Sequence, residues 1–478
     1  MTTFLIGLGI LIIGGALYGR FVERFFGADD RPTPAVSKRD GVDFVPMPTW
    51  KNCLIHLLNI AGTGPVLGPI QGILFGPIVF ITIPLGCVLA GAVHDFMIGM
   101  ISLRNDGAQM QELVRRYLGR EVAYLFNVFI CIMALLVVVA FTYSPGDIFV
   151  ISFMKQEATV TNCWTWVAYG LVFVYYLLAT YMPIDKLIGR VYPVIGSLFI
   201  VSAVIIFALI FTKHLPLQNL TWENWRGLKP NMIPLFFVTV ACGIASGFHS
   251  TQATLIARSV TNEKCGRKIF FNMMLTEGFI AMIWAAVTMG VMGKYGLSSA
   301  GNANAALVEI VNTLLGSKAG VIVMAGFIVL PITTGGTTMR ILRIMLGELL
   351  KIGRDNKLGK IVLGVSIVVS SLTLLLLVKF QPNGFAIIWR YFAWSNQVLV
   401  VFTLAVATAW CVQNNKTIAL TVIPGAFYLF VVSSFILNAK VGFNLSWDLS
   451  YLISALLSLA FIGFFSYKKI TSKNKGQL

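Results

Sequence analysis

The stretch NIAGTGPVLGP, residues 59–69, lies inside an apolar run that extends from residue 53 to residue 75. Three glycines and two prolines fall within eight of these residues. Proline inside a helix costs about 3 kcal/mol and removes a backbone hydrogen bond. Backbone freed at membrane depth cannot face lipid, so it must line an enclosed cavity or bind something. A plain proline kink is the alternative, but the density of breakers predicts a discontinuous helix with a substrate site at Gly62, Thr63, Gly64 and Gly68.

The composition around this stretch excludes a soluble protein. Of the 478 residues, 57% are hydrophobic and 12% are charged, against about 25% charged in soluble domains. The net charge of +17 does not indicate nucleic acid, because the basic residues lie in short loops between apolar runs. The seven cysteines form no C-x-x-C pair, which favours buried thiols over disulfides or zinc.

Thirteen apolar runs approach the roughly 20 residues that a helix needs to cross a bilayer. They predict an all-α polytopic membrane protein of about 13 spans, at residues 3–19, 53–75, 78–103, 122–142, 164–182, 193–212, 232–256, 270–293, 319–339, 361–378, 385–411, 417–437 and 449–467. The first run lacks a basic leader and a small-residue cleavage site, so we expect a retained span rather than a signal peptide.

The basic residues orient these spans. With thirteen spans, 27 of the 36 Lys and Arg fall in the loops of one side and eight, including Lys379, in those of the other, while Arg390 lies within a span. The positive-inside rule then predicts an outer N-terminus and a cytoplasmic C-terminus.

A second interruption lies in the seventh run. Small and polar residues cluster there between apolar halves, and we assign to substrate binding Gly243, Ser246, Gly247, His249 and Thr251. The second and seventh runs have opposite directions and start five spans apart. This is the arrangement of an inverted-repeat transporter whose site lies at the repeat interface.

A third polar cluster follows Pro331 in the ninth run. Its hydroxyls could take a small cation or a substrate oxygen, so coupling or gating is predicted for Thr333, Thr334, Thr337 and Thr338. Threonine hydroxyls in a span also bond to their own helix backbone, which is the simpler alternative.

His94 and Asp95 lie about eight residues from the cytoplasmic end of the third span. Charged groups at this depth are functional candidates because their desolvation is expensive. We expect the pair to relay protons or hold a gate. The alternative is a structural Asp95 that pairs with Arg104 or Arg390.

Glu277, in the eighth run, is the other acid at membrane depth and joins the predicted coupling residues. His249 is the histidine we expect to act chemically, because it lies inside a break, whereas we expect a structural role for His56. No metalloenzyme spacing, phosphate loop or G-x-S-x-G motif is present. An enzyme is therefore not predicted.

Each break also creates helix N-termini at membrane depth. Their free N–H groups and positive dipole ends suit an anion, which favours a small carboxylated solute or a peptide terminus. No part of the chain could supply a nucleotide-binding domain, so we expect transport without a cofactor, driven by a proton gradient or by sodium.

The motif of residues 59–69, followed by LAGAVHDF at 89–96, resembles the signatures of the carbon starvation protein A (CstA) family. SGFH at 246–249 and WSNQ at 394–397 resemble further patterns of that family, which adds Asn396 and Gln397 to the predicted substrate site. The resemblance implies a bacterial inner-membrane permease for peptides during carbon starvation, with proton-coupled pyruvate uptake in some members.

The family is grouped with the amino acid–polyamine–cation transporters, which implies a five-plus-five inverted repeat. One membrane domain is then expected, with an extra span at 1–20, a cytoplasmic loop at 21–52, repeats at 53–212 and 232–411, and two accessory spans with a basic tail at 412–478. The apolar periodicity of residues 302–316 predicts an outer helix that would match a lid. A second short helix is predicted inside, at 109–118.

Two departures limit the resemblance. The chain is shorter than the long members of the family, and Gly336 occupies the place of an Asp in the family stretch T-T-x-D-x-x-T-R. A sodium site is therefore not predicted at this place. A nutrient sensor that signals through a partner, and a sodium-coupled amino acid permease, remain the alternative functions. The oligomeric state stays open.

Overall fold

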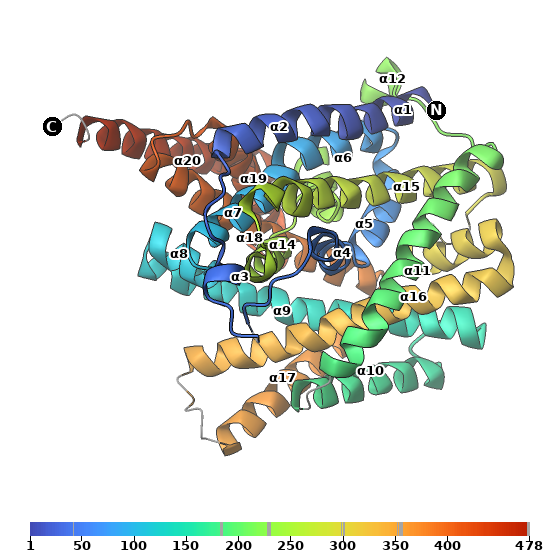
Figure 1. The fold of residues 1–478 in the computed structure, drawn as a ribbon. Coiled ribbons are helices and arrows are strands. Elements are labelled where there is room, and N and C mark those ends of the chain that lie inside the picture. The colour runs from blue at the N-terminus through green and yellow to red at the C-terminus, as the bar shows by residue number, and fades with distance from the viewer. Residues whose placement is uncertain are drawn as a thin grey trace. The chain divides into compact units, whose positions relative to one another are not determined.

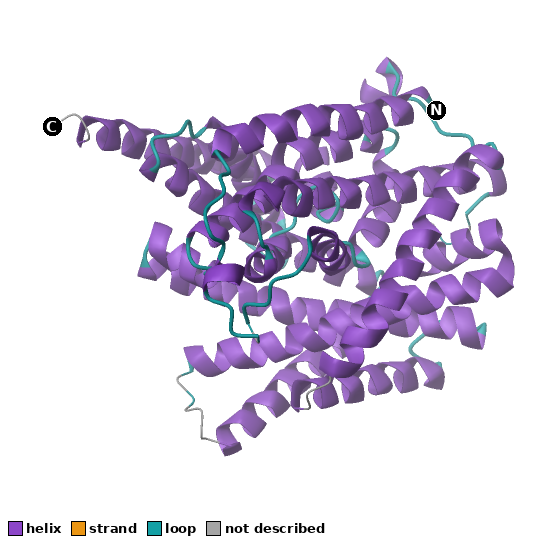
Figure 2. Ribbon diagram, viewed as in Figure 1, coloured by secondary structure: helices purple, strands orange, loops and turns teal. Residues whose placement is uncertain are grey.

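The computed structural model describes residues 1–41, 43–181, 185–226, 231–297, 299, 302–350, 352 and 357–475. Within these ranges the chain is helical, apart from turns, loops and one isolated β-bridge between Met47 and Val260 (Figures 1 and 2). The prediction of an all-α membrane protein is confirmed. Among the described residues, nine helices are long and apolar enough to cross a membrane, and a bent pair, Thr49–Ile60 with Gly64–Phe75, makes a tenth.

Two further predicted spans, 164–182 and 193–212, correspond to the helices Cys163–Tyr181 and Asp185–Thr212. The seventh run forms two short helices on either side of a break. Several helices continue past the predicted ends: the first reaches Phe26, and the fourth reaches Met154. Hydropathy marks only the apolar part of a helix, whereas backbone hydrogen bonding continues into its polar ends.

The chain divides into two compact units. The first comprises Met1–Asn127, Gln218–Met282 and Ala393–Leu478. Its complete helices are α1 (Thr2–Gly9), η1 (Ile10–Gly14), α2 (Gly15–Phe26), α3 (Pro34–Ser37), α4 (Thr49–Ile60), α5 (Gly64–Gly72), η2 (Ile73–Phe75), α6 (Val79–Gly86), η3 (Cys87–Gly91), α7 (Ala92–Arg104), α8 (Met110–Leu118), α12 (Trp222–Arg226), α13 (Met232–Thr239), α14 (Phe248–Ile256), η5 (Ala257–Ser259), η6 (Glu263–Cys265), η7 (Arg267–Phe271), α19 (Ala419–Asn438) and α20 (Trp447–Lys475).

The second unit comprises Val128–Leu217 and Ile283–Phe392. It contains η4 (Val150–Met154), α10 (Cys163–Tyr181), α11 (Asp185–Thr212), α16 (Ala303–Leu349) and α17 (Lys357–Lys379). Three helices belong partly to each unit: α9 (Arg120–Phe149), α15 (Asn272–Tyr295) and α18 (Gly384–Gln413). In the second unit α16 packs on α10, α11 and α17.

Both predicted short helices are present. The inner one is α8. The outer one is the start of α16, which Gly316 separates from the rest of that helix with a φ of 76°. Its apolar face is buried, as the spacing predicts, at Leu307, Ile310, Val311 and Leu314.

Candidate functional site

Both predicted breaks exist, and both lie in the first unit. Helices α4 and α5 meet at a bend of 48° across residues 61–63. The second break separates α13 from α14, and within it Gly243 has a φ of 91°. This left-handed conformation is accessible to glycine at little cost, so Gly243 lets the chain reverse its local direction between the two half-helices.

The two breaks pack directly against each other. A Cβ atom on Gly64, at the start of α5, would lie 2.5 Å from both Cβ and Sγ of Cys242. One on Gly243 would lie 2.5 Å from Cβ of Ala281, on α15. Glycine is therefore required at these positions by close approach of neighbouring segments. At Gly62, in contrast, an added Cβ would meet nothing within 4 Å.

Asn396 satisfies the backbone of the second break. Its side-chain oxygen accepts the N–H of Phe248 at 2.7 Å and its main-chain oxygen accepts that of Gly247 at 3.1 Å. Its amide donates to Ser246 Oγ at 2.7 Å. The N-terminus of α14, where a substrate anion is expected from sequence, is thus capped by the protein itself.

Gln397 serves the other half of this break. Its amide donates to the carbonyl of Phe237, near the end of α13, at 2.7 Å. Its Oε1 atom is buried and has no partner, and the same holds for Oγ1 of Thr63 at the first break. Of the predicted substrate-binding side chains, these two keep unused polar atoms that a solute or water could take.

Four ionisable side chains from three helices meet at the second break. His94 and Asp95 come from α7, His249 from α14 and Glu277 from α15, and all four are buried. Asp95 Oδ1 lies 2.7 Å from His94 Nδ1, and its Oδ2 lies 3.2 Å from His249 Nδ1. His249 Nε2 lies 3.4 Å from Glu277 Oε2.

These contacts allow a proton to be shared. If Asp95 is ionised, it accepts an N–H from each histidine, and the proton of His249 is then on Nδ1. The opposite nitrogen of a neutral His249 would direct a lone pair at the Glu277 carboxylate. One further proton, on His249 or on Glu277, removes this repulsion. The cluster can therefore hold a proton that a small rearrangement would move between the two residues.

The predicted coupling residues separate into two groups. His94, Asp95 and Glu277 join His249, and Asp95 pairs with histidines rather than with Arg104 or Arg390. The threonines of the third cluster lie on α16, in the second unit. Their hydroxyls bond to carbonyls of their own helix, for example Thr333 to Leu330 at 2.8 Å and Thr338 to Thr334 at 2.8 Å. The helix is not interrupted there, and a coupling role for these threonines stays a prediction.

The sequence matches the family model described as "Carbon starvation protein CstA" over residues 1–166, 146–315 and 297–434. The chain belongs to this family. An uncharacterized membrane protein of Haemophilus influenzae is 38% identical over 60% of this chain and 90% of its own length. The peptide transporter CstA of Escherichia coli is 28% identical over 68% of this chain and 55% of its own length.

A second peptide transporter CstA, from Campylobacter jejuni, is 27% identical over 82% of this chain and 62% of its own length. The chain thus spans about half to three fifths of the length of these two relatives. Among solved structures, a manganese transporter of Eremococcus coleocola aligns with a TM-score of 0.52 at 13% identity, covering 91% of this chain and 99% of that one. This likeness shows a shared membrane-transporter fold.

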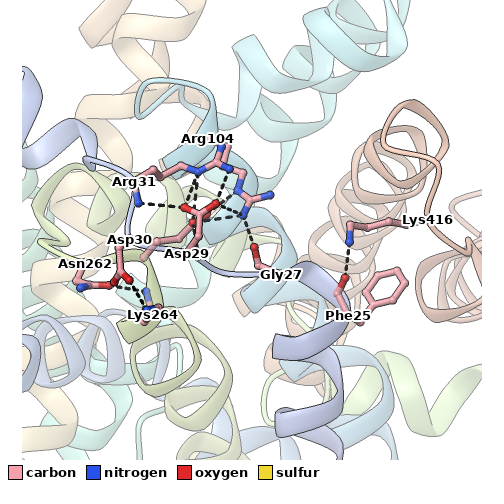
Figure 3. A network of polar contacts seen from close by, with 10 residues as sticks. Phe25, Gly27, Asp29, Asp30, Arg31, Arg104, Asn262, Lys264 and Lys416 are labelled. Carbon is pink, nitrogen blue, oxygen red and sulfur yellow. Dashed lines mark hydrogen bonds and ion pairs between the residues drawn. The ribbon is translucent and has the colours of Figure 1, made fainter.

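Sequence reasoning missed an ionic network in this CstA family chain, at the predicted cytoplasmic end of the first unit (Figure 3). Buried Glu263 accepts from Arg104 Nε at 2.6 Å and from the backbone N–H of Asp29 at 3.0 Å. Arg31 forms two bonds with the Asp29 carboxylate, and Lys264 pairs with Asp30. The Arg31 guanidinium holds the pKa of Asp29 well below its usual range. The network attaches the loop after α2 to η6 and α7.

A buried ion pair in the second unit was also missed. Lys379, which the sequence analysis places in an outer loop, is the last residue of α17, and its Nζ lies 2.9 Å from Asp147 Oδ1. Tyr169 donates to the same oxygen at 2.5 Å, and Lys379 also donates to the carbonyl of Ala158 at 2.8 Å. Assigning Lys379 to a loop was wrong because α17 continues past the predicted run end at 378. Asp147 was overlooked because α9 continues past the end of the predicted run at 142.

Proposed function

We propose that this chain is a secondary transporter that imports peptides or a small monocarboxylate such as pyruvate, coupled to protons, during carbon starvation. We place it in a bacterial inner membrane, with its N-terminus outside and its C-terminus in the cytoplasm. Membership of the CstA family, the peptide-transporter names of its relatives and the transporter fold support the general class. The sidedness of the basic loops supports the orientation.

The observation that carries proton coupling is the 3.4 Å contact between His249 Nε2 and Glu277 Oε2, at which a proton can be shared. His249 is the second residue of α14, directly beyond the break, so a movement of this half-helix changes its distance to Glu277. A change in that distance alters which of the two residues holds the proton. Movement of a half-helix and proton binding are thereby linked, which is what a coupled transporter needs.

We assign substrate binding to the first break, between α4 and α5. Thr63 is buried, its hydroxyl has no partner, and it lies at the N-terminus of the nine-residue helix α5. A hydroxyl donor beside the positive end of a helix dipole suits a carboxylate, the group that pyruvate and peptide C-termini share. Thr63→Val, which keeps the shape and removes the donor, should weaken uptake of both kinds of solute.

The direct test is uptake into proteoliposomes that contain the purified protein. Labelled pyruvate and dialanine are offered separately under an inward proton gradient, with and without a protonophore. We expect accumulation of at least one solute that the protonophore abolishes. The His249→Gln variant should lose this accumulation, whereas His214→Gln, at an exposed histidine away from the spans, should keep it.

Other outcomes identify the alternatives. Accumulation under a sodium gradient but not under a proton gradient would indicate a sodium-coupled permease. Saturable binding of a solute without any accumulation would favour a sensor. Either result would contradict the proposed proton-coupled transport.

A further inference from the structure

His56 is a further buried ionisable side chain near the cluster, and the proposed mechanism gives it no role. It lies on α4 with no exposed surface, and neither ring nitrogen has a hydrogen-bond partner. The rings of His56 and Phe270 pack edge to face, with their centroids 5.5 Å apart and an angle of 85° between their planes. A buried polar group without partners is destabilising, so a purely structural role does not explain why this position is a histidine.

The helix geometry places His56 between the cluster and one end of the first unit. That end is closed by the contact of Asn52 with Ser259, whose hydroxyl donates to the Asn52 side chain at 2.6 Å. Measured from this contact along the helices, His56 lies four residues away, or about 6 Å, and His249 lies ten residues away, or roughly 15 Å. This end is the predicted cytoplasmic one.

The charged groups around His56 come from three directions. α4 packs against α14, which carries His249, and against η7, which carries Arg267 and Lys268. Arg267 is paired with Glu23 at 2.8 Å, and Lys268 is exposed. Asp95 comes from α7, which packs against both α14 and η7. Lys51, on the same helix, is exposed. The buried charges that His56 meets are therefore those of the cluster.

We propose that His56 is the proton acceptor through which the cluster exchanges protons with the cytoplasmic end. When His249 carries the further proton on Nε2, its Nδ1 proton transfers to the Asp95 carboxylate and then, over a water, to a nitrogen of His56, which leaves His249 neutral. The imidazolium formed releases a proton from its other nitrogen to water near Asn52, and a ring rotation restores the starting state. This assignment rests on the proposed proton-coupled function and adds the route by which the proton leaves at the cytoplasmic end.

The test compares two transport modes in the same proteoliposomes, with labelled pyruvate and dialanine as probes. Proton-driven accumulation requires proton release on the inner side, whereas counterflow exchange of solute does not require net proton movement. For His56→Gln and His56→Leu we expect accumulation to fall by about a hundredfold, within the range of a positioned proton-transfer group. Counterflow should stay within about twofold of the wild type, since no binding group is removed.

Thermal unfolding separates this role from a structural one. Because His56→Leu removes an unpaired buried polar group, its unfolding midpoint should equal or exceed that of the wild type. His214→Gln is the matched control for loss of a histidine. Equal losses of accumulation and counterflow, or unchanged accumulation, would overturn the assignment. A wild type that accumulates neither probe under a proton gradient would overturn the proposed function, and this inference with it.

Discussion

At the scale of single residues, the proposed proton coupling depends on the contact between His249 and Glu277. His249 lies between two carboxyl groups, and Glu277 faces a titratable imidazole rather than a lysine or an arginine. A lysine or arginine would hold Glu277 permanently ionised. Histidine instead allows the pair to gain and lose a proton in the physiological range.

Replacing Glu277 by Gln should uncouple transport from protons. The glutamine amide can donate to His249 Nε2, which keeps the imidazole neutral without an added proton. We expect proton-driven accumulation to fall by about a hundredfold, while counterflow persists, both measured in proteoliposomes. Accumulation at the wild-type level would show that the shared proton is not used.

The glycines of the first break allow a matched test of packing. Gly64→Ala would place a methyl group 2.5 Å from the Cys242 side chain, whereas Gly62→Ala would place one in open space. Overpacking of this kind costs about 1–3 kcal/mol. We expect Gly64→Ala to lower the unfolding midpoint and Gly62→Ala to leave it unchanged. Equal behaviour of the two variants would contradict the close packing of the breaks.

At the scale of helices, the ends of α9, α10 and α17 are joined by one buried ion pair. The Lys379 ammonium donates to Asp147 and to the Ala158 carbonyl and lies 4.4 Å from the centre of the Tyr143 ring. Every group of this cluster that could be costly to bury is thus engaged. Removing one partner would leave an uncompensated buried charge, and the penalty for this exceeds the net value of the pair.

Lys379→Met should therefore destabilise the protein by about 3–5 kcal/mol, the typical penalty for a broken buried pair. Lys318→Met, at an exposed lysine of the same unit, should have almost no effect. Thermal unfolding in detergent measures both. The double variant Asp147→Leu with Lys379→Met should recover stability relative to Lys379→Met, and the absence of any recovery would contradict the burial of the pair.

At the scale of the whole chain, two charge systems act at the predicted cytoplasmic face. The excess of basic loop residues is predicted to orient the spans during insertion. The network around Glu263, with Arg104, Asp29 and Arg31, then holds the loop after α2 in place. Lys416, in the segment between α18 and α19, bonds to the carbonyl of Phe25, near the end of α2, at 2.6 Å (Figure 3). The loop is thus attached to segments far apart in sequence.

Acid should release this loop. Because the Arg31 guanidinium lowers the pKa of Asp29 in the folded protein, the stabilisation is present above the unfolded value of about 3.9. It is lost as the pH falls below that value. Hydrogen exchange of residues 27–41, corrected for intrinsic rates, should rise as the pH falls from about 5 to 3. The Arg31→Gln variant should show faster exchange of this loop already at neutral pH. If neither the fall in pH nor this substitution changes the exchange rate, the ion pairs do not hold the loop in place.

The orientation has its own test. A fluorescent protein fused after residue 478 should fold and fluoresce in a bacterial cytoplasm, and a cysteine placed near residue 1 should react with an impermeant thiol reagent from outside. The reverse labelling pattern would contradict the distribution of 27 basic residues on one side. Both measurements are made on intact cells.

The apolar spans and the two breaks follow from the sequence by itself, and the predicted sidedness of the loops rests on the sequence alone. Hydropathy, helix-breaking residues and loop charge act locally, so each can be read from a short window. The tertiary structure decided which polar residues meet. Asp95 and His249 are separated by 154 positions and Asp147 and Lys379 by 232; such pairs depend on how distant helices pack. Sequence proposed Asn396 as a substrate ligand, and only packing shows that it caps α14, because a cap is defined by the helix end beside it.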